Sequence, residues 1–463
     1  MSDHPQVKRR RGTKHDRTGC LTCRARRKKC VENTLPRCGS CVRLNLECVR
    51  EPVRRVVPGT SNAPREVAID ARPPQDGLAP GSAHGRSPST RVFMKYYVNF
   101  LALKLTACGY QNSFLSALLP MAMESQTLFD SVVALASGNM SNLDPAYQVA
   151  AMEARSRALR GLVADVSRPL AAIHNCETAL ASCLLLSASE AILGLRTGWS
   201  EHLAGARSVI MSARRVDCRG PEAFRGSAEG EWLLRNFAYH DILGSVTSGR
   251  PALIPGEYLE GLGDTVDSYL GVHSQLLVYI SQISALRAPE DMLAADEKRS
   301  DRDESVDPMA ALCQIEQKLR SWHPSCSDPI LESTAYAYKS AALIYLYQRV
   351  RQIHPMTGIS DSMASGEVQV ILDNIAQIPE DAHPDGILLF PLFMAGGETT
   401  SLQDMEVIRL RLRSIDTIRG FRNVLRACEV LEEVWWTRTT ATGCNSVDWK
   451  DILHSQGGGL LLT

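Results

Sequence analysis

The chain has 463 residues, 44% of them hydrophobic and 22% charged, with a formal net charge of zero. This is the composition of a soluble globular protein, and the length predicts two to four domains. The charge is unevenly spread, because residues 1–55 hold 16 Lys and Arg against 5 Asp and Glu, while the remainder holds 35 against 46. No Phe, Tyr or Trp precedes Phe93, which excludes an ordinary hydrophobic core in that stretch. This basic head therefore predicts a polyanionic partner.

The N-terminus shows no secretory signal, because residues 1–11 contain no apolar run and no cleavage-site pattern. The best candidate for a membrane span, residues 178–195, is interrupted by Glu190 and several serines. It therefore predicts a buried helix of a soluble protein. We expect an intracellular protein with reduced cysteines and no membrane partner.

Six of the 14 cysteines lie within 29 residues, in two halves with the same internal spacing. In each half the cysteines stand at offsets 0, 3 and 10, and the halves are displaced by 18 residues. In a reducing compartment this repeat indicates a metal site, and a disulfide framework is the alternative. The six predicted ligands are Cys20, Cys23, Cys30, Cys38, Cys41 and Cys48.

Six thiolates restrict the number of metal ions. Structural zinc takes four ligands, so two zinc ions need eight positions, which six sulfurs fill only if two of them bridge. The repeat makes it natural that each half contributes one bridging cysteine. Metal binding then replaces the missing core, since structural zinc supplies about 10–16 kcal/mol in small peptides.

The two halves differ in charge. Five of the six residues between Cys23 and Cys30 are basic, whereas the corresponding residues between Cys41 and Cys48 include Val42 and other apolar side chains. Both stretches predict a short helix stapled by metal, and a basic helix of this size fits the major groove of DNA. Its side chains are candidates for contacts to phosphates or to guanine. They are Arg24, Arg26, Arg27, Lys28 and Lys29.

Residues 20–48 resemble the fungal zinc binuclear cluster family of transcription factors. The run C-x2-C-R-x-R-R-x-K-C, followed by P-x-C-x2-C-x6-C, is similar to the signature of that family. The resemblance implies two zinc ions, with Cys20 and Cys38 as the bridging ligands. It also implies that Arg26 and Arg27 read a CGG triplet.

The head divides into a basic tail at 1–17, a zinc cluster domain at 18–50 and a linker at 51–91. The tail contains Lys8-Arg9-Arg10-Arg11, which predicts a nuclear import signal or further phosphate contacts, or else a merely solvated tail. The linker holds seven Pro and four Gly and shows no heptad repeat. Binding as a monomer and pairing through the large domain both stay open.

Residues 92–463 predict a large all-α domain, because apolar residues recur there at spacings of three and four and strand-like alternation is scarce. The clearest segments are 93–106, 147–163, 176–195, 201–214, 276–286, 341–350 and 404–436. Several strings in this region also resemble the fungal-specific transcription factor domain, which is helical and regulatory. They are Trp199 to Ala206, Tyr239 to Leu243, Ser248 to Pro251, Phe390 to Gly396, and Val434-Trp435.

Most distinctive side chains of this domain are expected to be structural. His202 is interpreted as a core or capping histidine, and the charged stretch 290–307 as a solvated loop, with an acidic activation segment as the alternative. Residues 447–453 predict a packed terminal helix or a short activation motif. Three tryptophans are expected in the core, namely Trp199, Trp435 and Trp436.

We found no G-x-S-x-G, H-E-x-x-H, P-loop or G-x-G-x-x-G motif, so the sequence does not favour an enzyme. The sequence favours a nuclear, DNA-binding regulator of RNA polymerase II transcription, with the transcription machinery or co-regulators as partners. The family resemblance implies an activator rather than a repressor. The family also implies control of one pathway, such as a secondary-metabolite gene cluster. The alternatives are a zinc module that binds RNA or protein, and an enzyme or effector-binding protein with a pocket in its helical domain.

Overall fold

The computed structural model describes residues 38–43, 88–109, 112–170, 172–196, 198–262, 271, 274–286, 307–354, 359–440, 447–457 and 459–463. The chain divides into two compact units, residues 1–81 and residues 82–463. The cysteine-rich head belongs to the first unit and the helical region to the second. Helix α2 (Gly39–Arg43) is the described element of the first unit.

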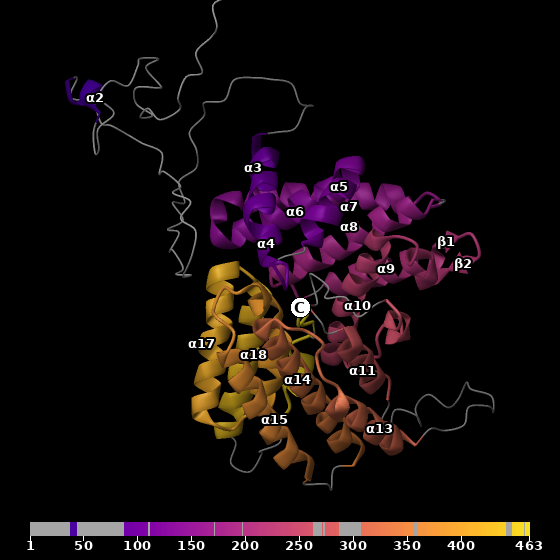
Figure 1. Cartoon of the computed structure of the whole chain (residues 1–463), viewed down its shortest axis with the longest axis vertical. Helices are drawn as coiled ribbons and strands as arrows, with labels where there is room; N and C mark the ends of the chain where they lie inside the picture. The colour runs from indigo at the N-terminus through magenta and orange to yellow at the C-terminus, as the bar shows by residue number, and fades with distance from the viewer. Residues whose placement is uncertain are drawn as a thin grey trace, which may run out of the picture. The chain divides into compact units, whose positions relative to one another are not determined.

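The second unit consists almost entirely of helices (Figure 1). Its N-terminal elements are α3 (Pro88–Tyr96), η1 (Tyr97–Leu101), α4 (Ala102–Lys104), η2 (Phe114–Leu118), α5 (Leu119–Glu124), α6 (Gln126–Leu143), η3 (Pro145–Tyr147), α7 (Gln148–Val166), α8 (Ile173–Ile192) and α9 (Trp199–Ser212). A short hairpin, η4 (Gly220–Phe224), α10 (Ala228–Ser248), η5 (Gly256–Leu259) and α11 (Ser274–Ala285) follow. The C-terminal elements are α13 (Pro308–Ser321), α14 (Pro329–Ile353), α15 (Ile359–Ala376), η7 (His383–Ile387), α16 (Leu389–Glu398), α17 (Leu402–Arg419), α18 (Arg422–Thr440) and α19 (Trp449–Ser455).

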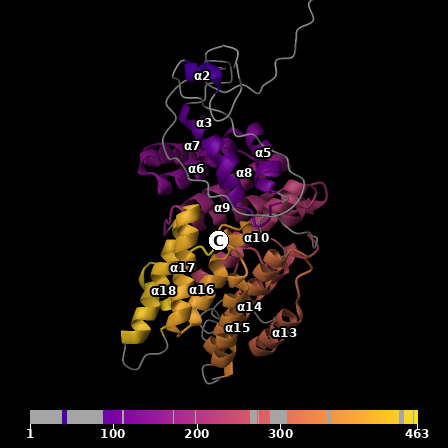
Figure 2. The same ribbon diagram turned by 60° about the vertical axis from the view of Figure 1, so that its left-hand side comes forward.

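These helices form two groups that share one core. Figures 1 and 2 show α3 to α8 gathered at one end of the unit, and α14 to α18 at the other. A single cluster of buried apolar side chains runs through both groups, from Phe93 to Leu462. Several long helices begin where a capping side chain accepts a hydrogen bond from one of the first amides. Ser125 accepts a hydrogen bond from Leu128 N at the start of α6, for example.

The predicted all-α domain is confirmed for the described residues, with one small exception. Strands β1 (Arg214–Arg215) and β2 (Cys218–Arg219) pair in an antiparallel hairpin directly after α9. The sequence predicted that the helix would continue to Arg214. Asp217 adopts a positive φ of 64° between the two strands, a conformation that aspartate tolerates better than most residues.

The apolar pattern at 404–436, which predicted helix throughout, forms two helices. Gly420 separates α17 from α18 and has a φ of 69°, a left-handed conformation that glycine adopts without steric penalty. The side chain of Asn139 in α6 donates to the Arg419 and Gly420 carbonyls, at 2.9 and 3.1 Å. The break is therefore held by a helix distant in sequence.

The expectations for the tryptophans are confirmed for two of three residues. Trp199 is 6% exposed and Trp435 is 3% exposed, but Trp436 is 67% exposed, so its placement in the core was wrong. Successive residues of an α-helix point about 100° apart. Trp436 therefore lies on a different side of α18 from Trp435, and that side faces solvent.

The C-terminal segment is part of the core. Leu460, Leu461 and Leu462 are each at most 2% exposed. Asn423 Nδ2 donates to the carbonyl oxygens of Leu461 and Thr463, at 3.2 and 2.8 Å. This segment thereby joins α18 to the centre of the helical unit (Figure 1).

Candidate functional site

The described part of the candidate metal centre is the Cys38–Cys41 pair. Cys38 directly precedes α2 and Cys41 lies within it, and both are 0% exposed. The Cys41 amide donates to the Cys38 carbonyl at 3.0 Å and lies 3.4 Å from Cys38 Sγ. An N–H directed at sulfur stabilises the thiolate and orients it, as outer hydrogen bonds do at metal sites.

This pair fits zinc. Thiolate is a preferred zinc ligand, and two cysteines separated by two residues can bind one ion together. The burial of both thiols is notable because the first unit contains no aromatic residue that would bury them. The neighbouring Arg43 is exposed in the last turn of α2, where its positive charge complements the C-terminal end of the helix dipole.

The other sequence-predicted site residues lie outside the described residues. These are the ligands Cys20, Cys23, Cys30 and Cys48, and the candidate DNA contacts Arg24, Arg26, Arg27, Lys28 and Lys29. The basic tail, residues 51–87 of the predicted linker and residues 290–306 also lie outside the described ranges. The predicted end of the linker at residue 91 was wrong, because residues 88–91 form the start of α3. Among the residues that are described, no group of three or more His, Cys, Asp or Glu side chains is arranged to hold a metal ion.

The polar residues buried in the helical unit brace its backbone. Asp241 of α10 accepts hydrogen bonds from the amides of Leu253 and Ile254, at 2.8 and 3.1 Å. Burial raises the pKa of this carboxyl to about 6. The bonds hold the segment that follows Ser248 to Pro251 against α10. The two strings that resemble the family, around Asp241 and around Pro251, thus pack against each other. An acidic residue within an apolar helix was the signal in the sequence that could have indicated this contact.

A second resembling pair has the same kind of structural role. Trp435 Nε1 donates to the Gly396 carbonyl at 2.8 Å, which joins α18 to α16. A Cβ atom on Gly396 would lie 2.6 Å from Leu431 Cδ1, so the two helices approach closely at this glycine. The string at 390–396 and the string at 434–435 therefore meet in the core.

The polar group around His202 joins three helices. His202 Nε2 of α9 lies 3.7 Å from Glu190 Oε1 of α8, and the same carboxylate pairs with Arg155 of α7. Glu190 is 1% exposed and His202 is 15% exposed by their side chains. The interpretation of His202 as a structural histidine agrees with this contact.

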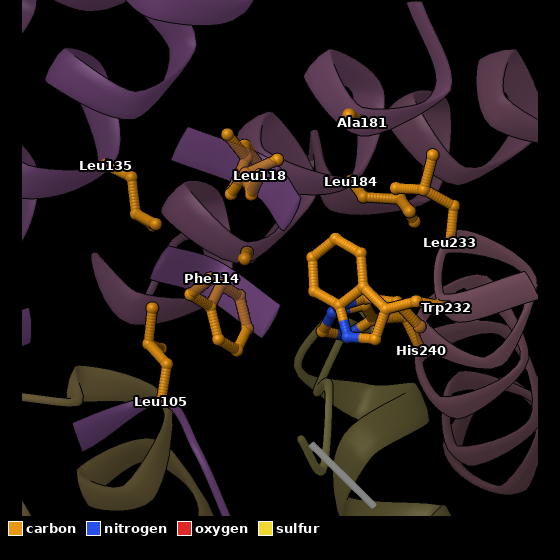
Figure 3. Close-up of a pocket in the computed structure, with 12 residues that line it drawn as sticks. Leu105, Phe114, Leu118, Leu135, Ala181, Leu184, Trp232, Leu233 and His240 are labelled. Atoms are coloured by element: carbon orange, nitrogen blue, oxygen red, sulfur yellow. The ribbon is translucent and has the colours of Figure 1, made fainter. Parts of the chain in front are cut away.

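Small cavities lie beside His240, and Figure 3 shows the side chains that line one of them. One of about 20 Å³ is lined by Phe114, Trp232 and several leucines, and another of about 30 Å³ lies on the side of Thr463. Trp232 Nε1 is buried there and has no hydrogen-bond partner among the described residues. These volumes hold a water molecule but no metabolite. They therefore do not favour an enzyme or effector pocket at this place.

None of the described helices combines the length and the apolar character that crossing a bilayer requires.

Comparison with known proteins identifies two regions. Residues 18–55 match the fungal Zn(2)-Cys(6) binuclear cluster domain, and residues 92–463 match the fungal specific transcription factor domain. The second match covers most of the chain. No solved structure matches the chain.

The similar proteins follow the same division. The zinc cluster transcription factor CZF1 of Candida albicans is 61% identical over 36 residues, which cover 8% of this chain and 9% of that protein. Zinc finger protein 1 from another strain of that organism gives the same values. The chain therefore matches only about a tenth of the length of these two relatives. The transcriptional activator protein UGA3 of Saccharomyces cerevisiae is 20% identical over 520 aligned residues, covering 95% of this chain and 96% of that protein.

Both matched domains are domains of transcription factors. The cluster domain binds zinc, and members of this family bind two zinc ions. The matched cluster domain contains the buried Cys38–Cys41 pair. The chain belongs to the fungal transcription factors in which a Zn(2)-Cys(6) binuclear cluster domain precedes a fungal specific transcription factor domain.

Proposed function

We propose that the six cysteines between Cys20 and Cys48 hold two zinc ions and that Cys20 and Cys38 are the bridging ligands. The repeated spacing and the buried Cys38–Cys41 pair support this assignment. A bridging sulfur binds both zinc ions, whereas a terminal sulfur binds only one. The family match supports Cys38 as a bridging ligand, and the amide of Cys41 near Cys38 Sγ supports a thiolate at that position. Bound zinc supplies the cohesion that the head lacks in apolar side chains.

We propose further that the basic stretch at 24–29 enters the major groove of DNA. Arg26 and Arg27 read guanines of a CGG-like triplet, because a guanidinium fits the O6 and N7 acceptors of guanine with two hydrogen bonds. Arg24, Lys28 and Lys29 contact phosphates, which position the helix but carry no sequence information.

The cellular role that this supports is activation of RNA polymerase II genes in the nucleus. The similarity over nearly the full chain to a protein named a transcriptional activator supports activation. The target is a set of genes of one pathway, such as a secondary-metabolite gene cluster. The helical unit regulates the protein through co-regulators, or pairs two copies of it.

A Cys38→Ser variant tests the metal assignment. The full-length variant should lose zinc, measured by atomic emission spectrometry, together with its affinity for a CGG-bearing duplex. Cys313→Ser is the matched control, because Cys313 is exposed on α13 of the second unit. Two zinc ions and unchanged DNA affinity in Cys38→Ser would contradict the bridging role.

An Arg27→Ala variant tests base reading. Loss of a bidentate contact to guanine should cost about 1–3 kcal/mol on a CGG duplex, and less on random DNA. Fluorescence anisotropy at several salt concentrations separates the two kinds of contact. An equal loss on both duplexes, with a smaller salt dependence, would show that Arg27 contacts phosphate instead.

A further inference from the structure

A groove of about 700 Å³ lies between α7, α8 and α9, in the helical unit. Its floor is apolar and buried, with Leu162, Cys183 and Val209 each at most 7% exposed. Val163 and Val166 form part of its wall and remain 62% and 45% exposed. Apolar side chains gathered around a hollow and left open to water mark an interaction site.

The shape of the groove suits a helix. The side chains of α9 that line it run from Glu201 to Ser212, about three helical turns or roughly 16 Å at 1.5 Å per residue. Gly205, Ser208 and Ser212 are small and recur at spacings of three and four, so they leave room above α9. A Cβ atom on Gly205 would meet only Cys183 Sγ, at 3.8 Å. A partner helix could therefore lie close along this wall.

The charges at the two ends of the groove have opposite sign. Arg168, which follows α7, and Arg214, in the hairpin that follows α9, line one end. Arg215 and Arg219 of the same hairpin are also exposed. None of these four arginines forms an ion pair with a carboxylate of the described residues. Their positive charge is thus available to an acidic partner.

The other end of the groove carries Glu201, whose charge is partly satisfied within the chain. Its carboxylate accepts hydrogen bonds from Gly198 N and Ser200 Oγ, both at 2.9 Å. The hydrogen bond of the carboxylate with its own backbone amide, together with these two bonds, lowers the pKa of Glu201. This end repels other carboxylates, so an acidic partner binds in one direction only.

We propose that this groove binds an amphipathic helix of a protein partner, a regulatory contact beyond DNA binding. The apolar stripe of the partner covers Leu162 and Val209, and its acidic residues lie at the end marked by Arg168 and Arg214. A small amphiphilic acid is a poorer occupant, because the groove is open along its length and would leave such a molecule largely in water. A helix buries one face in a groove and keeps the other in solvent.

The probe is a set of three synthetic, fluorescein-labelled peptides of about four helical turns. Each has leucine, isoleucine or phenylalanine at helical spacing on one face and glutamates at one end. Anisotropy titration against the full-length chain measures their affinity. Peptides of the same composition in scrambled order, and peptides with lysine in place of glutamate, are the controls. At least one probe should bind and both controls should bind about tenfold more weakly.

Two variants link the binding to the groove. Gly205→Leu fills it, and a double Arg168→Glu and Arg214→Glu change reverses the charge at its end; each should weaken binding about tenfold. Gly366→Leu is the control for the first variant, because Gly366 is exposed on α15 with no atom within 4 Å of an added Cβ. If Gly205→Leu fails to fold by circular dichroism, the exposed arginine pair still provides the test.

Three results would overturn the proposal. The first is failure of all three probes to bind the full-length chain. The second is probe binding that neither variant weakens. The third is a self-association of the chain, seen by sedimentation, that Gly205→Leu abolishes and that displaces the peptides. In that case the occupant of the groove is a second copy of the chain.

Discussion

Replacing His240 by asparagine is expected to remove a pH dependence from the stability of the helical unit. His240 lies in α10, is 2% exposed, and its Nδ1 is 2.9 Å from Thr463 Oγ1. Burial lowers the pKa of its imidazole to about 3. The folded protein therefore keeps this ring neutral, whereas the unfolded chain protonates it near the ordinary value of about 6.5.

The sign and the size of the effect of His240 on the unfolding free energy follow from this difference in pKa between the folded and the unfolded state. The stability that the neutral His240 contributes to the folded state is fully present above pH 6.5. It is lost as the pH falls from 6.5 toward 3, because only the unfolded state takes up the proton. Between pH 7.5 and pH 5.0 the loss amounts to about 2 kcal/mol. This figure does not depend on the exact folded-state pKa, provided that it lies well below 5.

The neighbouring Asp241 acts in the opposite direction. Its pKa is raised by burial to about 6, so the folded state holds a proton that the unfolded state releases, and stability increases as the pH falls from about 6 to 4. The total profile of the wild type therefore mixes the two contributions. Subtracting the profile of His240→Asn isolates the histidine, because Asp241 is present in both proteins.

Urea unfolding of the full-length protein, followed by tryptophan fluorescence at pH 7.5, 6.5 and 5.0, measures the effect. Asparagine retains a polar atom near the position of Nδ1, so the hydrogen bond to Thr463 can persist. The difference in unfolding free energy between wild type and variant should shrink by about 2 kcal/mol from pH 7.5 to 5.0. A constant difference across this range would refute a buried, neutral His240.

Three further changes test the helical unit and the tail. Trp435→Phe should lower the unfolding free energy by about 1–3 kcal/mol, because it leaves a buried carbonyl of α16 without its donor. Trp436→Phe, at an exposed position, should change the unfolding free energy by less than about 0.5 kcal/mol. Equal effects of the two variants in urea unfolding would refute this prediction. Gly420→Ala should cost about 1–2 kcal/mol through its left-handed backbone, whereas Gly366→Ala in a helix should be neutral or stabilising. If both variants shifted the melting temperature in the same direction, the result would contradict the requirement for glycine at the break between α17 and α18. Deleting residues 1–17 should reduce nuclear accumulation of a fluorescent fusion, and an unchanged distribution would reject the import signal.

The metal site could be predicted from the sequence because its cysteine ligands lie close together along the chain. Cysteines separated by two residues can reach one ion whatever the rest of the protein does. The buried pair Cys38 and Cys41 agrees with that prediction, and the family matches agree with the two-domain organisation. The identity of the bases that Arg26 and Arg27 contact stays a prediction.

The helices were also predictable, since apolar spacing reports which residues can share one helix face. The ends of the helices were less so. The pattern at 404–436 passes through Gly420 without interruption, and the break is held by Asn139 of α6. The exposure of Trp436 depends on which face of α18 packs against α16. Both features rest on contacts between elements distant in sequence.

The sequence by itself determined the helical nature of the large domain and predicted the zinc ligands and the basic stretch that would contact DNA, because each is a local pattern of residue types. Only the tertiary structure decided that Asp241 braces the segment after α10, that the chain around Leu461 is buried, and that α7 and α9 border an open groove. A hydrogen bond or a groove forms between surfaces that meet after folding, and the order of residues along the chain does not state which surfaces will meet.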